Sequence, residues 1–335
     1  MVGHSLTRKV SALSLFQTDA WLGAWWNTWG TTAGFSSVIP GGSGGSGLYL
    51  DNYRFRGVLP IRCLQFVGTN YRRISTPRTE YNQLRSEWFT DSEFEFVQSL
   101  PWNEAVFRDI VDHSPDLNEI KRLCKSKRWL FRVVHSDDAY GISALGDFHT
   151  YLGKLGYNTR LRLFNRRKVL QSCGEISRRN LWPNECDTFF QLLNDFHRDR
   201  WGTPCFGRLS LAFHKQFLAD IEKEGGVPQL SLLSCDQSAI SVLYNVEFKG
   251  TVYNLQSGYL ESFHKKLSIG SLHLGYCIEE AFLDPGVRLF DLLAGGGKND
   301  NYKKRLATDI TPLVSVMIVR GTLLKLLYLL KHPDW

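Results

Sequence analysis

The sequence lacks the patterns of a secreted, membrane-spanning or metal-dependent protein. The seven cysteines are odd in number and widely spaced with no CxxC pair, which argues against both a disulfide framework and a zinc site. There is no uncharged run of the about 18 residues that a spanning helix needs. The N-terminus has no apolar core before a small-residue cleavage site. These absences predict a cytoplasmic protein with reduced thiols, no transmembrane segment and no metal.

Short catalytic signatures are missing as well. The sequence contains no GxSxG, no Walker loop, no HExxH and no GxGxxG at a strand–helix junction. No single motif therefore assigns a reaction, and the chemistry has to be inferred from weaker patterns.

Composition indicates a folded protein with a basic surface. The length of 335 residues favours two domains, and the 10 Trp, 13 Tyr and 21 Phe argue against disorder. The net charge of +7 favours an anionic partner, namely nucleic acid, anionic lipid or a phosphate-bearing ligand. The charge alone does not choose among these three.

The N-terminal half, residues 1–150, predicts a mixed α/β domain. Residues 48–68 are rich in β-branched and aromatic residues and predict strands, and residues 114–129 predict a helix capped by Ser114. Residues 40–47, a Pro-Gly-Gly-Ser-Gly-Gly-Ser-Gly run, predict a loop. Residues 21–29 predict a core-facing helix with five apolar side chains on one face: Trp21, Leu22, Trp25, Trp26 and Trp29.

The second domain, residues 151–335, begins in a basic helical region at 146–172 and continues with a helix at 185–198. Three short strand patterns follow, at 229–234, 239–246 and 252–259, and predict an antiparallel meander. Apolar residues at helical spacing then predict a helix that ends at Asp284, before a strand at 287–293.

The loop between the third strand and that helix predicts an anion site. A helix N-terminus offers free main-chain N–H groups and a favourable dipole to a phosphate. Gly270 would let a phosphate approach the backbone closely. The residues expected there are Lys265, Lys266, Ser268, Gly270 and Ser271. A purely structural helix start is the alternative.

A carboxylate and a tyrosine are the first candidates for acid–base chemistry. Asp291 shares a strand face with Val287, Leu289 and Leu293, and burial on an apolar face would raise the pKa of its carboxyl. A structural acid paired to a nearby donor is the alternative. Tyr302 could protonate a leaving thiolate, and Lys303 could hold a carboxylate or phosphate, unless both are surface residues.

Other candidates are more isolated in the sequence. Glu261 and His264 lie after the meander, and either could take a proton from an amine. Arg166 and Arg167 could contact an anionic substrate or could simply belong to a solvated helix face.

Taken in order, these segments resemble a known family. Residues 186–307 resemble the acetyltransferase domain of the CelD cellulose-biosynthesis family, within the GNAT superfamily and distantly similar to the FemAB aminoacyl transferases. The turn Ser268–Gly270, the motif Phe290–Gly295 and the pair Tyr302–Lys303 carry the resemblance. Phe16–Trp29 is similar to the family's opening segment, and the glycines after Gly295 lengthen the loop before Tyr302.

The resemblance implies tandem GNAT-like α/β folds with mixed central sheets flanked by helices, the first degenerate and the second holding acetyl-CoA or another acyl-CoA. It implies attack of an amine on the thioester, with main-chain N–H groups near Ser257 polarising the carbonyl. Asp291 or Glu261 would act as base and Tyr302 as acid. An exopolysaccharide or cell-envelope precursor is one expected acceptor.

Two alternatives remain open. The first is a FemAB-like enzyme that uses aminoacyl-tRNA, in which the positively charged protein would contact tRNA. Without that activity, no nucleic-acid partner is expected. The second is a non-catalytic scaffold of a polysaccharide-synthesis complex, in which residues 314–331 form an amphipathic helix for a partner or a membrane surface. The sequence does not predict an oligomeric state.

Overall fold

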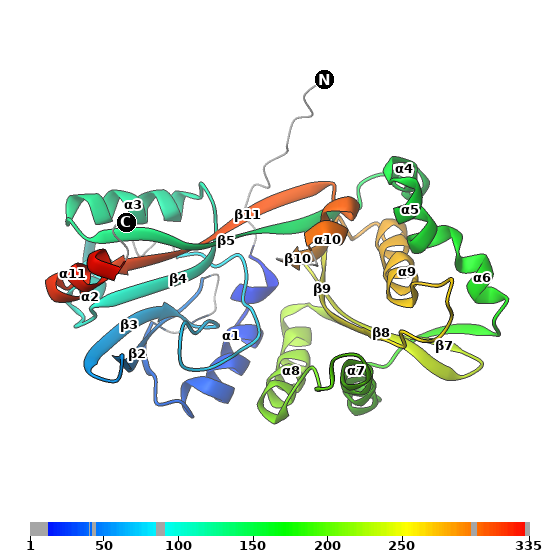
Figure 1. Cartoon of the computed structure of the whole chain (residues 1–335), viewed down its shortest axis with the longest axis horizontal. Coiled ribbons are helices and arrows are strands. Elements are labelled where there is room, and N and C mark those ends of the chain that lie inside the picture. The colour runs from blue at the N-terminus through cyan, green and yellow to red at the C-terminus, as the bar shows by residue number, and fades with distance from the viewer. Residues whose placement is uncertain (1–12, 40, 42–44, 85–90, 296–299, 332–335) are drawn as a thin grey trace, which may run out of the picture. The chain divides into compact units, whose positions relative to one another are not determined.

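The computed structural model describes residues 13–39, 41, 45–84, 91–295 and 300–331 (Figure 1). The chain forms two compact units. The N-terminal unit is described from residue 13 to 138 and from 311 to 331, and the C-terminal unit comprises residues 139–310. The expected domains were 1–150 and 151–335. The units differ from them in two places: residues 139–150 belong to the C-terminal unit, and residues 311–331 belong to the N-terminal unit. Part of the predicted loop, Pro40 and residues 42–44, lies outside the described residues.

The N-terminal unit is a mixed sheet with helices on both faces. Strands β1–β3 are antiparallel, β3 and β4 are parallel, and β11 is antiparallel to β4. Its elements are η1 (Leu15–Gln17), α1 (Asp19–Trp25), η2 (Trp26–Gly30), β1 (Ser36–Ile39), β2 (Leu48–Phe55), β3 (Leu59–Phe66), α2 (Asp91–Ser99), β4 (Glu104–Val111), α3 (Pro115–Ser126), β11 (Asp309–Val319) and α11 (Thr322–Lys331). Strand β5 (Leu130–Ser143) leads the chain into the C-terminal unit.

Alternation along β3 separates two apolar layers in this unit. Leu64 and Phe66 pack in a cluster with α3, whereas Ile61 and Cys63 pack in a cluster with α11. The predicted capped helix is confirmed, because the Ser114 hydroxyl accepts the Leu117 N–H at 3.3 Å. Of the five residues expected on one face of the first helix, Trp26 is half-buried and the other four are buried.

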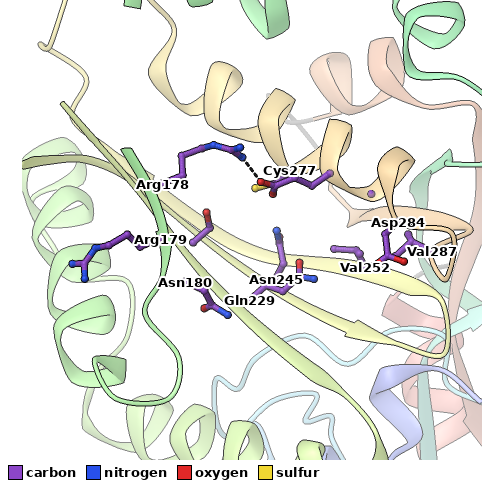
Figure 2. Close-up of a pocket in the computed structure, with 12 residues that line it drawn as sticks. Arg178, Arg179, Asn180, Gln229, Asn245, Val252, Cys277, Asp284 and Val287 are labelled. Carbon is purple, nitrogen blue, oxygen red and sulfur yellow. Dashed lines mark hydrogen bonds and ion pairs between the residues drawn. The ribbon is translucent and has the colours of Figure 1, made fainter. Parts of the chain in front are cut away.

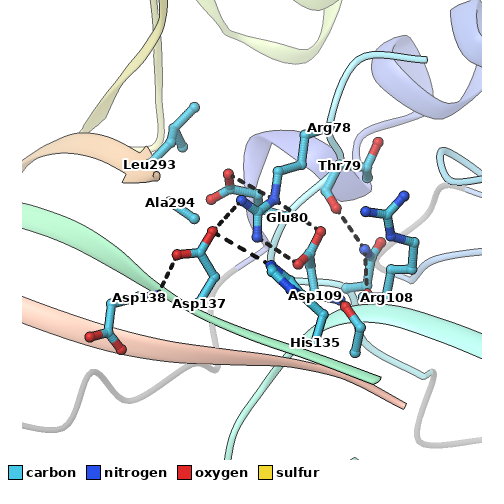
Figure 3. A network of polar contacts seen from close by, with 12 residues as sticks. Arg78, Thr79, Glu80, Arg108, Asp109, His135, Asp137, Asp138, Leu293 and Ala294 are labelled. Atoms are coloured by element: carbon cyan, nitrogen blue, oxygen red, sulfur yellow. Dashed lines mark hydrogen bonds and ion pairs between the residues drawn. The ribbon is translucent and has the colours of Figure 1, made fainter. Parts of the chain in front are cut away.

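A buried ionic network joins distant segments of this unit. Figure 3 shows Arg78 among three carboxylates. Its guanidinium donates to Asp109 and to Asp137 at 2.7 Å each, and Nε lies 3.5 Å from Glu80. Asp109 and Glu80 are almost fully buried, so Arg78 compensates charges that water cannot reach.

The C-terminal unit follows a β–α–α–β–β–β–α–β–α order after a helical entry. Its elements are α4 (Phe148–Lys154), α5 (Tyr157–Arg160), η4 (Leu161–Asn165), α6 (Arg167–Gln171), β6 (Ile176–Asn180), α7 (Cys186–Trp201), α8 (Arg208–Ile221), η5 (Glu222–Glu224), β7 (Val227–Cys235), β8 (Ser238–Phe248), β9 (Thr251–Tyr259), α9 (Ile269–Leu283), β10 (Leu289–Ala294) and α10 (Asp300–Leu306). Both units are mixed α/β, which confirms the predicted class.

The sheet of this unit is also mixed. Strands β6, β7, β8 and β9 are successively antiparallel, so the predicted meander is confirmed. Strand β10 is parallel to β9 and antiparallel to the last residues of β5. Helices α7 and α8 cover one face and α9 the other (Figure 1). Helix α9 contributes Leu274, Cys277 and Ile278 to the core, as its spacing predicts.

The C-terminal segment differs from the expected helix over 314–331. Residues 309–319 form strand β11, and only 322–331 are helical. An apolar run such as Val314–Val319 fits a buried strand as well as a helix, and its β-branched content favours the strand. The basic region at 146–172 is helical in four short pieces rather than one.

All seven cysteines are free thiols. In the described part of the chain, no helix has both the length and the apolar content that crossing a bilayer requires. Among the same residues, no group of three or more His, Cys, Asp or Glu side chains is arranged to hold a metal ion.

Candidate active site

The parallel strands β9 and β10 separate part of the way along their length. They pair at Thr251, Val252 and Tyr253, opposite residues 289–291, and no later residue of the two described strands is paired between them. Strand β10 also has an irregularity after Asp291, where Leu293 adopts a φ of +62°. Beyond this point, main-chain groups of β10 bond to side chains instead: the Leu293 N–H donates to Asp291, and the Leu293 carbonyl accepts from Lys303.

A cleft of about 750 Å³ opens beside this separation. It is lined by the second half of β9, the first turn of α9, the end of α7 and the start of α10. Its lining includes His197, Arg200, Leu255, Ser257, Tyr259, Gly270, Ser271, Tyr302 and Lys303. The structure therefore brings together predicted site residues that lie up to 46 positions apart, from Ser257 to Lys303.

A β-bulge lies at the wall of the cleft. Asn254 pairs with Asn245 and Gln256 with Tyr244, so Leu255 is the extra residue on β9 and has no partner in either neighbouring described strand. Bulges of this kind re-aim main-chain groups and are common beside active sites. The sequence predicted carbonyl-polarising N–H groups near Ser257. The N–H of Ser257 itself donates to Gln256 Oε1 at 2.9 Å. The Leu255 N–H is therefore the better candidate.

His197 is held in one tautomer at the cleft wall. Its Nε2 lies 3.0 Å from the Ser257 carbonyl oxygen. A carbonyl oxygen can only accept, so Nε2 carries a hydrogen, and in the neutral ring Nδ1 is then the acceptor. In this form of the ring, Nδ1 can accept a proton, as a general base must.

The start of α9 faces the cleft through Gly270 and Ser271. The Leu272 N–H bonds the Ser268 carbonyl at 3.0 Å, so the N–H groups of residues 269–271 have no acceptor within the helix. A side chain at 270 would lie 2.6 Å from the Tyr259 ring, so only glycine fits. The Tyr259 hydroxyl accepts from Arg200 at 2.5 Å, which places a cation beside this turn.

Tyr302 and Lys303 both line the cleft from α10. Loss of solvent around the Tyr302 phenol, and to a lesser extent the neighbouring Tyr259, raises the pKa of Tyr302, so the phenol stays protonated at neutral pH. The Lys303 ammonium donates to the carbonyls of Leu293 and Ala294 at 3.2 and 2.8 Å. Lys303 thus holds the irregular end of β10.

Asp291 lies at the last paired position of β9 and β10 and does not line the cleft. Its side chain is 1% exposed, and Oδ1 accepts the Leu293 N–H at 2.8 Å. This contact fixes the backbone at the point where the strands separate.

The other candidates in the connecting loop lie outside the cleft lining. Glu261 is exposed and lies 3.6 Å from Arg200 Nε. His264 Nδ1 accepts the Lys266 N–H at 3.1 Å. Lys265 and Lys266 are exposed, and Ser268 begins α9 without capping it through its side chain.

Arg166 and Arg167 serve the packing of the C-terminal unit. Arg166 donates to the Lys266 carbonyl. Arg167 pairs with Glu279 and stacks on Tyr276 at 3.8 Å. Neither side chain reaches the cleft lining.

A second, smaller cavity of about 300 Å³ lies between α9 and strands β6–β9. Figure 2 shows Arg178 directed toward α9, where it pairs with Glu280, and Arg179 directed away from it. Asn245 is fully buried, and its Oδ1 accepts from Asn254 at 2.7 Å. This polar cavity does not share the cleft's candidate acid–base groups.

Arg200 and Leu255 are absent from the sequence-based site, and His197 carries only a weak case there as an isolated histidine. In α7, residues 197, 200 and 201 lie three and four apart, a spacing that places them on one face. The helix predicted at 185–198 ended before residues 200 and 201, so the sequence analysis did not group them. The role of Leu255 had no signal, because a bulge depends on strand register.

Residues 158–304 match the family model described as Acetyltransferase (GNAT) domain. This range contains the whole cleft lining, so the similarity to a GNAT acetyltransferase domain covers the part of the chain that forms the cleft. A search of curated proteins gave no match.

Solved structures share the fold at low sequence identity. The crystal structure of FemX matches with a TM-score of 0.58 and 11% identity, over 94% of this chain and 98% of that one. A protein of unknown function from Bacteroides thetaiotaomicron VPI-5482 matches with a TM-score of 0.53 and 10% identity, over 94% and 92% of the two chains. The GNAT and Fem-like parts of the predicted resemblance are confirmed at the level of fold.

Proposed function

We propose that this protein is an N-acyltransferase that moves an acyl group from an acyl-CoA thioester to an amine. One observation carries the proposal: β9 and β10 separate directly beside a helix N-terminus, and the cleft there is lined by the bulged residue Leu255 and by the first turn of α9. Such a cleft suits a thioester, because a thioester needs main-chain donors at its carbonyl and a cationic or dipolar site for its phosphates.

The phosphate end of the thioester would bind at the first turn of α9. Gly270 and Ser271 offer main-chain N–H groups there, and Arg200 supplies positive charge nearby. Lys265 and Lys266 are exposed just before the first turn of α9. We propose that both contact the phosphates at the outer edge of this turn.

The reacting carbonyl would be polarised by the Leu255 N–H. His197 Nδ1 takes a proton from the attacking amine as the new N–C bond forms. The C–S bond then breaks, and the Tyr302 phenol gives its proton to the departing thiolate. In this scheme Asp291 and Lys303 act as positioning residues, since both hold the end of β10.

The acceptor is proposed from the resemblance to the CelD family. A sugar amine of an exopolysaccharide or cell-envelope precursor is our first candidate, with lysine and polyamines as further amines to compare. Glu261 and His264 do not line the cleft, so only an acceptor large enough to extend beyond it would contact them. Arg166 and Arg167 are expected to keep structural roles.

Acetyl-CoA turnover with a panel of amines tests the proposal. His197→Asn should lower kcat/KM by about 10²- to 10⁴-fold, the usual contribution of a general base, while CoA still binds. His113→Asn is the matched control, because His113 is exposed in the N-terminal unit at a φ of +59°, which asparagine tolerates. Unchanged turnover in both His197→Asn and Tyr302→Phe would refute the mechanism.

A FemAB-like transfer from aminoacyl-tRNA is the second candidate, and the fold shared with FemX favours it. It predicts tRNA binding that weakens steeply with salt. Absence of tRNA binding at low salt would remove it. If neither CoA nor tRNA raised the melting temperature, a non-catalytic scaffold would be the better description.

A further inference from the structure

Helix α11 is apolar on two opposite faces. Its inner face contributes Leu324 and Tyr328, which are 3% and 4% exposed. Its outer face carries four leucines spaced i, i+3, i+4 and i+7, the repeat of a single helix face. Their exposures are 61%, 54%, 38% and 79%: Leu323, Leu326, Leu327 and Leu330.

The orientation of α11 is fixed from inside the N-terminal unit. The Tyr328 hydroxyl donates to the fully buried Glu104 at 2.5 Å and accepts from Arg72 at 3.0 Å. The Lys325 ammonium donates to the Arg128 carbonyl at 3.2 Å. Because these contacts prevent rotation, the outer leucines cannot turn inward without breaking a buried polar network.

Exposed cations lie close to α11 in the fold. Phe55 packs against Tyr328 with ring centres 5.8 Å apart, and the turn that follows it exposes Arg56 and Val58. Lys127 and Arg128 are exposed next to the Lys325 contact. Within the described part of the chain, Arg56, Lys127 and Arg128 form no ion pair.

We propose that the outer face of α11 docks on an anionic lipid bilayer, with the four leucines in the interfacial region and the nearby cations at the headgroups. A leucine face with basic neighbours is the composition of interfacial helices. A stable protein interface uses roughly 20–30 residues a side, whereas this face is one short helix wide. The inference does not depend on the acyl transfer.

Vesicle sedimentation of the full chain tests the proposal. Wild type should sediment with vesicles of phosphatidylcholine and phosphatidylglycerol, and much less with phosphatidylcholine alone. Raising the salt from about 0.1 M to about 1 M should weaken binding, since the screening length falls from about 10 to about 3 Å. The double variant Leu326→Gln, Leu330→Gln should bind at least about tenfold more weakly.

The matched control is Leu209→Gln with Leu283→Gln, which changes two exposed leucines of the C-terminal unit and should leave vesicle binding unchanged. Lys127→Gln should reduce binding about fivefold on anionic vesicles only. Circular dichroism melting checks that each variant is folded.

Three results would overturn the proposal. The first is no sedimentation of wild type with anionic vesicles at low salt. The second is equal binding by the leucine variant and wild type. The third is a dimer, seen by light scattering and dissociated by the leucine variant, without vesicle binding; this would assign the face to a second copy of the chain.

Discussion

Replacing Gly270 with alanine perturbs the turn on which the proposed acyl-CoA site depends. The added Cβ would lie 2.6 Å from Cδ1 and Cε1 of Tyr259, whereas ordinary contact begins near 3.4 Å. The ring cannot withdraw freely, because its hydroxyl is bonded to Arg200 and the guanidinium lies 4.9 Å from the ring centre. The first turn of α9 and the ring must therefore separate by several tenths of an ångström.

This overpacking should lower the free energy of unfolding by about 1–3 kcal/mol. A displacement approaching 1 Å in a binding site can reduce turnover by about 10²-fold. We therefore expect Gly270→Ala to bind CoA at least about tenfold more weakly. Isothermal titration with CoA measures the affinity, and urea unfolding measures the stability.

Gly153→Ala is the control, because Gly153 lies in α4 with open space where a Cβ would be added. It should leave CoA affinity unchanged and the protein at least as stable. Wild-type CoA affinity in a destabilised Gly270→Ala variant would show that this turn is not part of the site. No destabilisation would show that the contact with Tyr259 is not as close as described.

Two further predictions concern stability. In the unfolded chain His273 takes up a proton near pH 6.5, whereas burial lowers the pKa of His273 in the folded protein to about 3. The stability that His273 contributes above pH 6.5 should therefore be lost as the pH falls toward 3. His273→Gln should flatten urea-measured stability over this range by about 1.4 kcal/mol per pH unit, and an unchanged slope would contradict the burial. Arg78→Gln should lower the free energy of unfolding by about 3–5 kcal/mol, because it leaves buried carboxylates unpaired. Arg122→Gln, which breaks an ion pair on the surface, should change the stability far less, and equal effects of the two variants would refute the network's role.

Periodic side-chain patterns made most of the C-terminal unit predictable. The meander and α9 follow from alternation and helical spacing, and Tyr302 and Lys303 lie in the cleft where the resemblance suggested a site. Residues 314–319 were ambiguous, because a short apolar run suits a buried strand and a helix equally.

The remaining site features depend on pairing and tertiary contacts. The separation of β9 from β10 and the bulge at Leu255 are properties of strand register, which side-chain periodicity does not specify. His197 reaches the cleft from a helix 60 residues before Ser257, so only the fold brings the two together. Asp291 was recognised as a buried acid, but its bond to the Leu293 N–H depends on the irregularity of β10.

Amide hydrogen exchange with saturating acetyl-CoA tests the central claim most directly. If the thioester binds between the separated strands with its phosphates on α9, peptides covering residues 254–258 and 268–272 should become protected, while the first turn of α3 should not change. Protection confined to β6 and β7 beside the second cavity, or no protection anywhere, would contradict the account.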